Sequence, residues 1–463
     1  MKKLHLLFLT IAIAAGAGSC KKYLDIKPKG VFVPQAISDY RLLLDATSSN
    51  QKSAGFFNTF SNDVLYSDDM TFNPFSVTMA DAHALNAYRF LPDIYLESES
   101  DPDWDAMYNQ IYTCNIVIGQ VMNATGGTLP EKQKLLAEAR VHRAFAYFTL
   151  VNLYAKQYTP ASAGTDPGVP LRVTTDFEEK LPRRSVQEVY DYLVNDLQAA
   201  VPYLPATPDA TATNRPVQPT AYTLLARAAL FMGQYEQAHA YADSALQDYS
   251  TLADFNTLPP NPAFPSALVY PINFKNPETL MEITTISPIS LFYASNELLA
   301  AFPDNNDLRK TTFFIADNQL GLNFGSISME WFGRQPTKGP SVPEAYLVRA
   351  ESSARLGNAA DAVADLNLLR SKRFRTGSSY QVSAPNAAAA LALVKAERRR
   401  ELAFRGFRFF DVKRYNAYDG DNINIMHTDP EGTYTLAANS NGFALPIGRQ
   451  YIQLNPEITQ NPR

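Results

Sequence analysis

The order of apolar and polar residues along the chain predicts a mainly helical protein. Apolar side chains recur at spacings of three and four over residues 105–121, which places them on one face of a helix. A second pattern of this kind covers residues 130–154. A third covers residues 185–201, where Ser185 and Glu188 have the spacing of a helix-capping pair. We therefore expect three long helices in the first half of the chain.

Two later segments resemble each other and predict a repeat. They read TAYTLLARAALFMGQYEQAHAYADSAL from residue 220 and EAYLVRAESSARLGNAADAVADLNLLR from residue 344. When Gly233 is aligned with Gly357, alanines coincide on both sides, as expected of two helices that approach closely around a glycine turn. This is the tetratricopeptide pattern. Two repeats alone leave their faces uncovered, so the earlier helices are expected to complete the stack as degenerate copies.

Two long stretches, 56–103 and 250–343, lack such periodicity and are rich in proline, asparagine and aromatic residues. Loops of this length in a compact domain are usually functional. The predicted fold is therefore a helical repeat scaffold with long loop-rich insertions that carry the binding surface.

The N-terminus has the form of a secretory signal. It reads MKKLHLLFLTIAIAAGAGSCKK, with a basic start, an apolar run too short to span a membrane, and small residues before Cys20. The end of this segment resembles a bacterial lipobox, whose cysteine carries the lipid; an ordinary signal peptide that happens to contain a cysteine is the alternative. We expect a signal peptide over residues 1–19, lipidation of Cys20, a tether over 20–34 and a single domain over 35–463.

Composition excludes some classes of function. The chain has 463 residues, of which 46% are apolar and 19% are charged, so it can bury a large core. Its net charge of −5 gives no general attraction to nucleic acid or to an anionic membrane. No nucleic-acid partner is expected.

Recognisable catalytic and metal-binding motifs are absent from the sequence. The histidines outside the signal are scattered and have no ligand-like spacing. There is no nucleophile elbow and no phosphate-binding glycine loop. The segment DPDWDAMYNQIY imitates a calcium loop for three positions and then departs from it, so helix capping explains its aspartates better. Asp68 and Asp69 could in principle serve glycoside hydrolysis, but adjacent acids in a loop are usually solvated. We expect no enzyme activity, no cofactor and no metal.

One segment near the C-terminus combines charge with aromatic surface. Residues 397–415 read ERRRELAFRGFRFFDVKRY. The segment could bind nucleic acid, contact a ligand or form an internal structural clamp. Glu401 lies four residues before an arginine, and Arg408, Asp411 and Arg414 follow one another at intervals of three, which places opposite charges side by side on a helix. The clamp is the interpretation that this spacing favours.

The same segment contains the residues of a turn. Gly406 is expected to end one helix and begin a second. Phe404, Phe407 and Phe410 are then expected to enter the core while the ion pairs fasten the corner.

This segment resembles the C-terminal signature of the SusD/RagB family, the outer-membrane nutrient-binding lipoproteins of Bacteroidetes. Further segments resemble the same family in chain order: KYLDIKP after the cysteine, WDAMYNQIYTCNIVI, EARVHRAFAYFTLVNLYA, NDLRK and ALPIGRQYIQLNPEITQNPR. One departure concerns Arg405-Gly406, where the family usually has Glu-Gly, which puts one family ion pair in doubt.

The resemblance implies a function that composition does not. Family members lie on the cell surface over a TonB-dependent barrel transporter of the SusC type. They bind an oligosaccharide, or in some members a peptide, and pass it on without breaking a bond. The domain would consist of an N-terminal part over about 35–240 and a C-terminal part over about 260–463. The protein would be anchored in the outer membrane by lipid and face the cell exterior. A tetratricopeptide-type scaffold that binds only protein partners is the alternative.

Aromatic rings in the loops are the candidate ligand contacts, because flat rings stack well on the apolar faces of sugars. Each ring could instead anchor its own loop by hydrophobic contact. Trp104 is expected in the core, which makes Trp331, the other tryptophan, the leading candidate. The predicted ligand-binding residues are Trp331, Phe332, Tyr66, Phe72, Phe75 and Tyr88.

Overall fold

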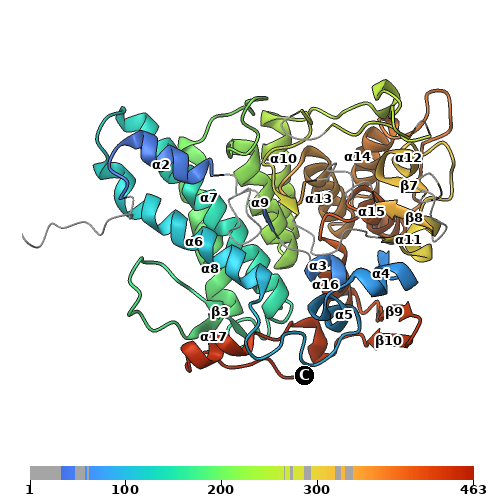
Figure 1. Ribbon diagram of the computed structural model, residues 1–463. Helices are drawn as coiled ribbons and strands as arrows, with labels where there is room; N and C mark the ends of the chain where they lie inside the picture. Colours follow the sequence, from blue (N-terminus) through green and yellow to red (C-terminus); the bar gives the residue numbers. More distant parts are fainter. Residues whose placement is uncertain are drawn as a thin grey trace, which may run out of the picture.

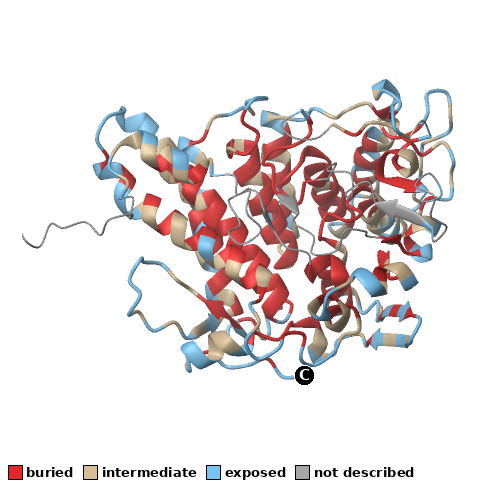
Figure 2. Cartoon of the chain, viewed as in Figure 1, coloured by how far each residue is buried: buried red, intermediate tan, exposed pale blue. Residues whose placement is uncertain are grey.

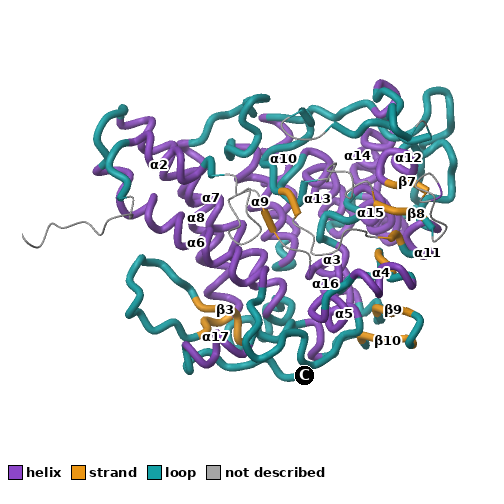
Figure 3. The backbone as a smooth tube through the Cα atoms, in the orientation of Figure 1, coloured by secondary structure: helices purple, strands orange, loops and turns teal. Residues whose placement is uncertain are grey.

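Helices dominate the computed structural model, and the strands are short (Figure 3). The structure describes residues 33–46, 58–59, 62–264, 266–271, 275–285, 293–316, 318, 325–328 and 337–463. The predicted fold class, a tetratricopeptide-like helical scaffold, is confirmed.

The three predicted long helices are present, each with a capping residue at its start. They are α6 (Pro102–Gln120), α7 (Leu129–Tyr154) and α8 (Val186–Ala200). The carboxylate of Asp101 accepts hydrogen bonds from the backbone N–H groups of Asp103 and Trp104, so the first aspartate of this segment does cap a helix. Ser185 and Glu188 form the predicted capping box of α8.

Both predicted repeats fold as helix pairs around a glycine turn. Gly233 and Gly357 have φ of +74° and +93°, values that only glycine adopts without strain. The small residues that coincide in the two sequences, Ala226 with Ala350 and Ala238 with Ala362, are all fully buried. The helices are α9 (Gln218–Phe231), α10 (Tyr235–Asp248), α13 (Val342–Arg355) and α14 (Ala359–Ser371).

The helices form one array that is continuous in space but interrupted in sequence (Figure 1). Each of α6 to α10 packs on the next, and α10 packs directly on α13. From there α13 contacts α14 and α15 (Ala387–Glu401). Buried residues concentrate along this array (Figure 2). The stretch between α10 and α13 is therefore an insertion, because the two helices that flank it pack directly on each other.

The two stretches predicted as loops contain short elements that join them to each other. The first holds α3 (Asn62–Leu65), α4 (Pro74–Met79) and α5 (Ala82–Tyr88), and the second holds α11 (Asn296–Ala300) and α12 (Arg309–Phe313). A parallel pair links β1 (Asn58–Thr59) to β5 (Thr284–Thr285). A four-stranded sheet has the order β2 (Met70–Thr71), β6 (Tyr293–Ala294), β8 (Ser326–Ser328) and β7 (Phe314–Ala316). Elements this short leave no periodic pattern, which is why the sequence does not reveal them.

The remaining elements close the ends of the array. The helix α2 packs on α6 and α7, and α16 packs on α3. None of the helices in the described part of the chain is long and apolar enough to cross a membrane. The elements are α2 (Ile37–Leu44), β3 (Pro167–Pro170), β4 (Arg183–Ser185), α16 (Arg408–Asp419), β9 (Ile425–Asp429), β10 (Gly432–Leu436) and α17 (Arg449–Leu454).

Candidate functional site

Three of the predicted ligand-binding aromatics lie in the core. Tyr66 and Tyr88 are fully buried, and Phe72 is 3% exposed. The ring of Tyr88 is stacked between Phe72 and His427, with centroid separations of 4.2 Å on each side. Its hydroxyl donates to the carbonyl of Thr428 at 3.0 Å. Their burial contradicts the prediction that these residues offer exposed ring faces to a ligand.

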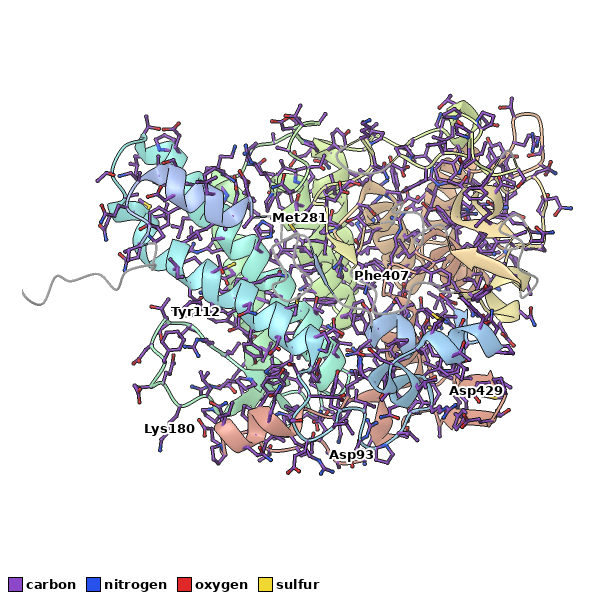
Figure 4. All side chains as sticks on the ribbon, in the orientation of Figure 1. Asp93, Tyr112, Lys180, Met281, Phe407 and Asp429 are labelled. Atoms are coloured by element: carbon purple, nitrogen blue, oxygen red, sulfur yellow. The ribbon has the colours of Figure 1, made fainter. Side chains whose placement is uncertain are left out.

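The reason lies in a contact between distant parts of the chain. The hairpin of β9 and β10 packs beside α5, because Tyr88 and Arg89 bond to Thr428 and Asp429 of the hairpin. Asp429 lies near the edge of the molecule (Figure 4). Arg89, next to α5, pairs with Asp429 at 2.8 Å. Both ring nitrogens of His427 lie within hydrogen-bonding distance of backbone carbonyls, those of Tyr88 and Ser67. No local pattern indicates a contact between residues more than 300 positions apart.

The other predicted aromatics have different positions. Phe75 is half-buried beside a small cluster that includes Tyr293. Trp331 and Phe332 lie outside the described residues, so their role stays a prediction. The described chain resumes at residue 337, and the backbone N–H of Lys338 donates to the carbonyl of Ile283 at 2.8 Å.

Trp104 belongs to the core, as predicted. It is 5% exposed, and its ring meets that of Tyr154 edge-on at 5.1 Å. Cys114 is a buried free thiol, and burial raises its pKa. Among the described residues, no three or more His, Cys, Asp or Glu side chains gather in a way that could hold a metal ion.

The charged segment at 397–415 turns a corner in the way predicted. Gly406 has φ of +76° and lies between the end of α15 and the start of α16. Phe404, Phe407 and Phe410 are buried, and Phe407 lies in the middle of the molecule (Figure 4). The corner is therefore an internal feature with its rings in the core.

Its ion pairs are only partly those predicted from spacing. Asp411 and Arg414 do pair along α16, at 3.0 Å. Arg408, however, binds Asp68 through two hydrogen bonds of 2.7 and 2.8 Å, in place of the expected Asp411. Residue spacing along one helix predicts only the ion pairs within that helix, and Asp68 lies on another segment.

Asp68 and Asp69 are thus both paired with arginines. Asp69 is 1% exposed, and its carboxylate accepts a hydrogen bond from Arg399 at 2.8 Å. Burial raises the pKa of Asp69 to about 6, against the opposing effect of Arg399. The solvated position expected for these two acids is wrong.

Glu401 is the centre of a buried network. It is fully buried and pairs with Arg373 at 2.9 Å and with Arg309 at 3.0 Å. Burial raises the pKa of Glu401, but the two arginines outweigh burial and hold it below its ordinary value. Arg405, where a carboxylate was expected from the family pattern, donates to the hydroxyl of Tyr270 at 2.9 Å. The charges of this segment face inward, which supports the structural clamp.

A polar hollow of about 290 Å³ is a feature that the sequence analysis missed. Three segments line it: the chain just after α7, one face of α16, and the turn that follows β10. Its residues are mostly polar side chains, with Ala417, Phe443 and Ala444 among them, and they come from separate parts of the sequence, so no motif marks them.

Comparison with known proteins agrees with this architecture. Residues 22–230 match a family described as starch-binding and associating with the outer membrane, and residues 343–463 match the SusD family. The chain belongs to the SusD family. One relative is the SusD-like protein P25 of Formosa agariphila, which is 20% identical over 96% of this chain and 95% of its own length.

Solved SusD structures share the fold over most of the chain. A SusD superfamily protein from Bacteroides thetaiotaomicron superposes with a TM-score of 0.72 at 20% identity, covering 92% of this chain and 100% of its own. A laminarin binding SusD-like protein superposes with a TM-score of 0.60 at 18% identity, covering 87% and 94%. These superpositions establish the fold. Because the sequence identities are low, they do not identify the ligand of this protein.

Proposed function

We propose that this protein binds an oligosaccharide at the cell surface and passes it to a TonB-dependent outer-membrane transporter. The observation that carries the proposal is the match to the SusD family at both ends of the chain. One solved protein of the same fold is named for binding laminarin, a glycan. The lipobox-like segment before Cys20 supports a lipid anchor. The outer membrane as its location, with the domain facing the exterior, rests on the family match.

Binding without catalysis is part of the proposal. The most acidic and basic part of the chain is committed to internal ion pairs around Glu401 and Asp411. Asp68 and Asp69, the adjacent acids that could have served hydrolysis, are held by arginines. The purified protein is expected to return its glycan uncut.

Trp331 remains the proposed stacking residue. Lys338, seven positions later, is 4% exposed, and its ammonium pairs with the carboxylate of Asp63 at 2.5 Å. A fixed flank favours selective stacking, because a rigid support holds the ring in place.

The Trp331→Ala variant tests this role. We expect it to weaken oligosaccharide binding roughly ten- to hundredfold, by analogy with the ~1–3 kcal/mol of a base stacked on an aromatic ring. The measurement is calorimetric titration of both proteins with the same oligosaccharide. Unchanged affinity would place the site elsewhere.

The transport step is tested in the outer membrane itself. A tagged protein is extracted in mild detergent and purified, and a barrel transporter is expected to co-purify with it. Recovery of only soluble protein partners, with no barrel and no retained glycan, would favour the scaffold alternative. Binding of peptides but of no glycan would favour a peptide-binding member of the family.

A further inference from the structure

The polar hollow has the composition of a small-molecule site. Its volume of about 290 Å³ lies at the lower limit for ligand pockets, which suits a single sugar unit better than a long chain. Side-chain amides and hydroxyls form much of its lining, together with two lysines and one carboxylate. The carboxylate, Asp166, pairs with Lys156 at 3.5 Å, and Lys156 is well exposed at the rim. The lining therefore has two amino groups against one carboxylate.

Lys413 supplies the second cation from inside the protein. It projects from α16 and is 5% exposed. Its ammonium donates to the carbonyls of Asn152, at 2.9 Å, and Ala155, and so caps the C-terminal end of α7. A lysine ammonium has three donors, and these carbonyls use two of them. Burial lowers the pKa of Lys413 to about 7, which an anion in the hollow would reverse.

One unsatisfied polar atom among the described residues lies close by in the lining. Gln157 lines the hollow and is 7% exposed, and its side-chain oxygen accepts no hydrogen bond from the described residues. A buried acceptor without a donor costs about 1–3 kcal/mol. Asn439, also in the lining, has φ of +59°, a left-handed turn conformation that asparagine adopts more readily than most residues.

We propose that this hollow binds the carboxylate-bearing unit of an acidic glycan, such as a hexuronic acid. The two lysines would hold the carboxylate, since charge-assisted hydrogen bonds are stronger than neutral ones. The amides and hydroxyls of the lining would hold the ring hydroxyls. The choice of a sugar rests on the proposed function, whereas the preference for an anion rests on the lysines. The described residues that line the hollow come from other segments than the one that carries Trp331.

The proposal is tested by ligand-observed NMR. The intact mature domain is titrated with glucuronate, glucose and acetate. Glucuronate is expected to bind, and to bind at least about tenfold more tightly than either of the others. Two variants at the exposed rim avoid disturbing the fold. Lys156→Gln removes the outer cation, and Asn441→Asp places a carboxylate in the lining. Each is expected to weaken glucuronate binding by about fivefold or more.

A matched control is Lys372→Gln, which removes a surface lysine whose partner, Asp254, lies at 3.4 Å, much like the Lys156 pair. It should leave glucuronate binding unchanged. Equal binding of glucose, acetate and glucuronate would overturn the proposal, as would an absence of effect in both rim variants. If glucuronate does not bind while neutral oligosaccharides do, the hollow fails and the proposed function stands. If no glycan of any kind binds, the proposed function fails as well.

Discussion

At the scale of single residues, the molecule depends on charges buried in pairs. Glu401 receives hydrogen bonds from arginines on two other segments, and neither partner is exposed to solvent. A buried charge is tolerated only while its partners remain, because removing one leaves the others unpaired in a medium that solvates them poorly. The residue therefore matters for stability and has no path to a ligand.

The Glu401→Ala variant is expected to lose ~3–5 kcal/mol of unfolding free energy, because Arg373 and Arg309 are left buried without it. Chemical denaturation measures the loss. Arg449→Ala is the matched control: its ion pair with Asp93 is as short, at 2.7 Å, but both side chains are more than half exposed, so it should cost under about 1 kcal/mol. Glycan affinity below the melting range should be unchanged. Lost binding with normal stability would move Glu401 from clamp to site.

The pKa of Asp103 leads to a second prediction at this scale. Burial first, and then Asp63 and Asp101, raise the pKa of Asp103 to about 8, and Lys338 only partly opposes them. Between about pH 4 and 8 the folded protein therefore keeps a proton that the unfolded chain loses, so this residue's contribution to stability declines as pH rises. The Asp103→Asn variant should lose this decline. Denaturation of both proteins at pH 5 and pH 8 measures it, and equal slopes would contradict the assignment.

At the scale of elements, the corner between α15 and α16 explains why a glycine stands at position 406. A Cβ there would lie 2.1 Å from a carboxylate oxygen of Asp63, which is itself held by Lys338. The positive φ excludes most other residues as well. The corner thus joins the C-terminal helices to α3 by close packing as well as by charge.

Gly406→Ala should therefore lower the melting temperature much more than Gly357→Ala. Both glycines have positive φ, and each substitution carries a strain of about 1 kcal/mol. Gly357 has open space around its Cβ position, whereas Gly406 would also displace Asp63 from its ion pair. Thermal unfolding of the two variants measures the difference. Equal shifts would mean that backbone strain alone accounts for the glycine.

The elements also show how far a sequence can be interpreted. Helices α6, α7, α8 and both repeats follow from periodicity and capping, because those signals are local. The burial of Tyr88 beside His427 and the choice of Asp68 by Arg408 depend on contacts across more than 300 positions. The hollow also depends on distant parts of the chain, since Gln157 and Lys413 both line it only in the folded chain.

At the scale of the whole molecule, a continuous helical array carries two loop-rich stretches that are joined to each other. The small sheets that join β1 to β5 and β2 to β6 form this link. A scaffold that positions loops suits capture of a ligand, because it limits the conformational freedom that binding must remove.

The anchor is a prediction at the same scale. Cys20→Ala should release the protein from the outer-membrane fraction, because a lipid chain on this cysteine would anchor it in the membrane. Fractionation with immunodetection measures it. A variant that still sediments with the outer membrane would show that the anchor lies elsewhere.

Glycan capture is tested most directly by calorimetric titration. The purified mature protein is titrated with a panel of neutral and acidic oligosaccharides, and the recovered sugars are then analysed by mass. We predict saturable binding of at least one oligosaccharide, which is recovered at its original mass because no bond is broken. Shortened sugars that persist through extensive purification, or a panel with no binding at all, would contradict the proposed role.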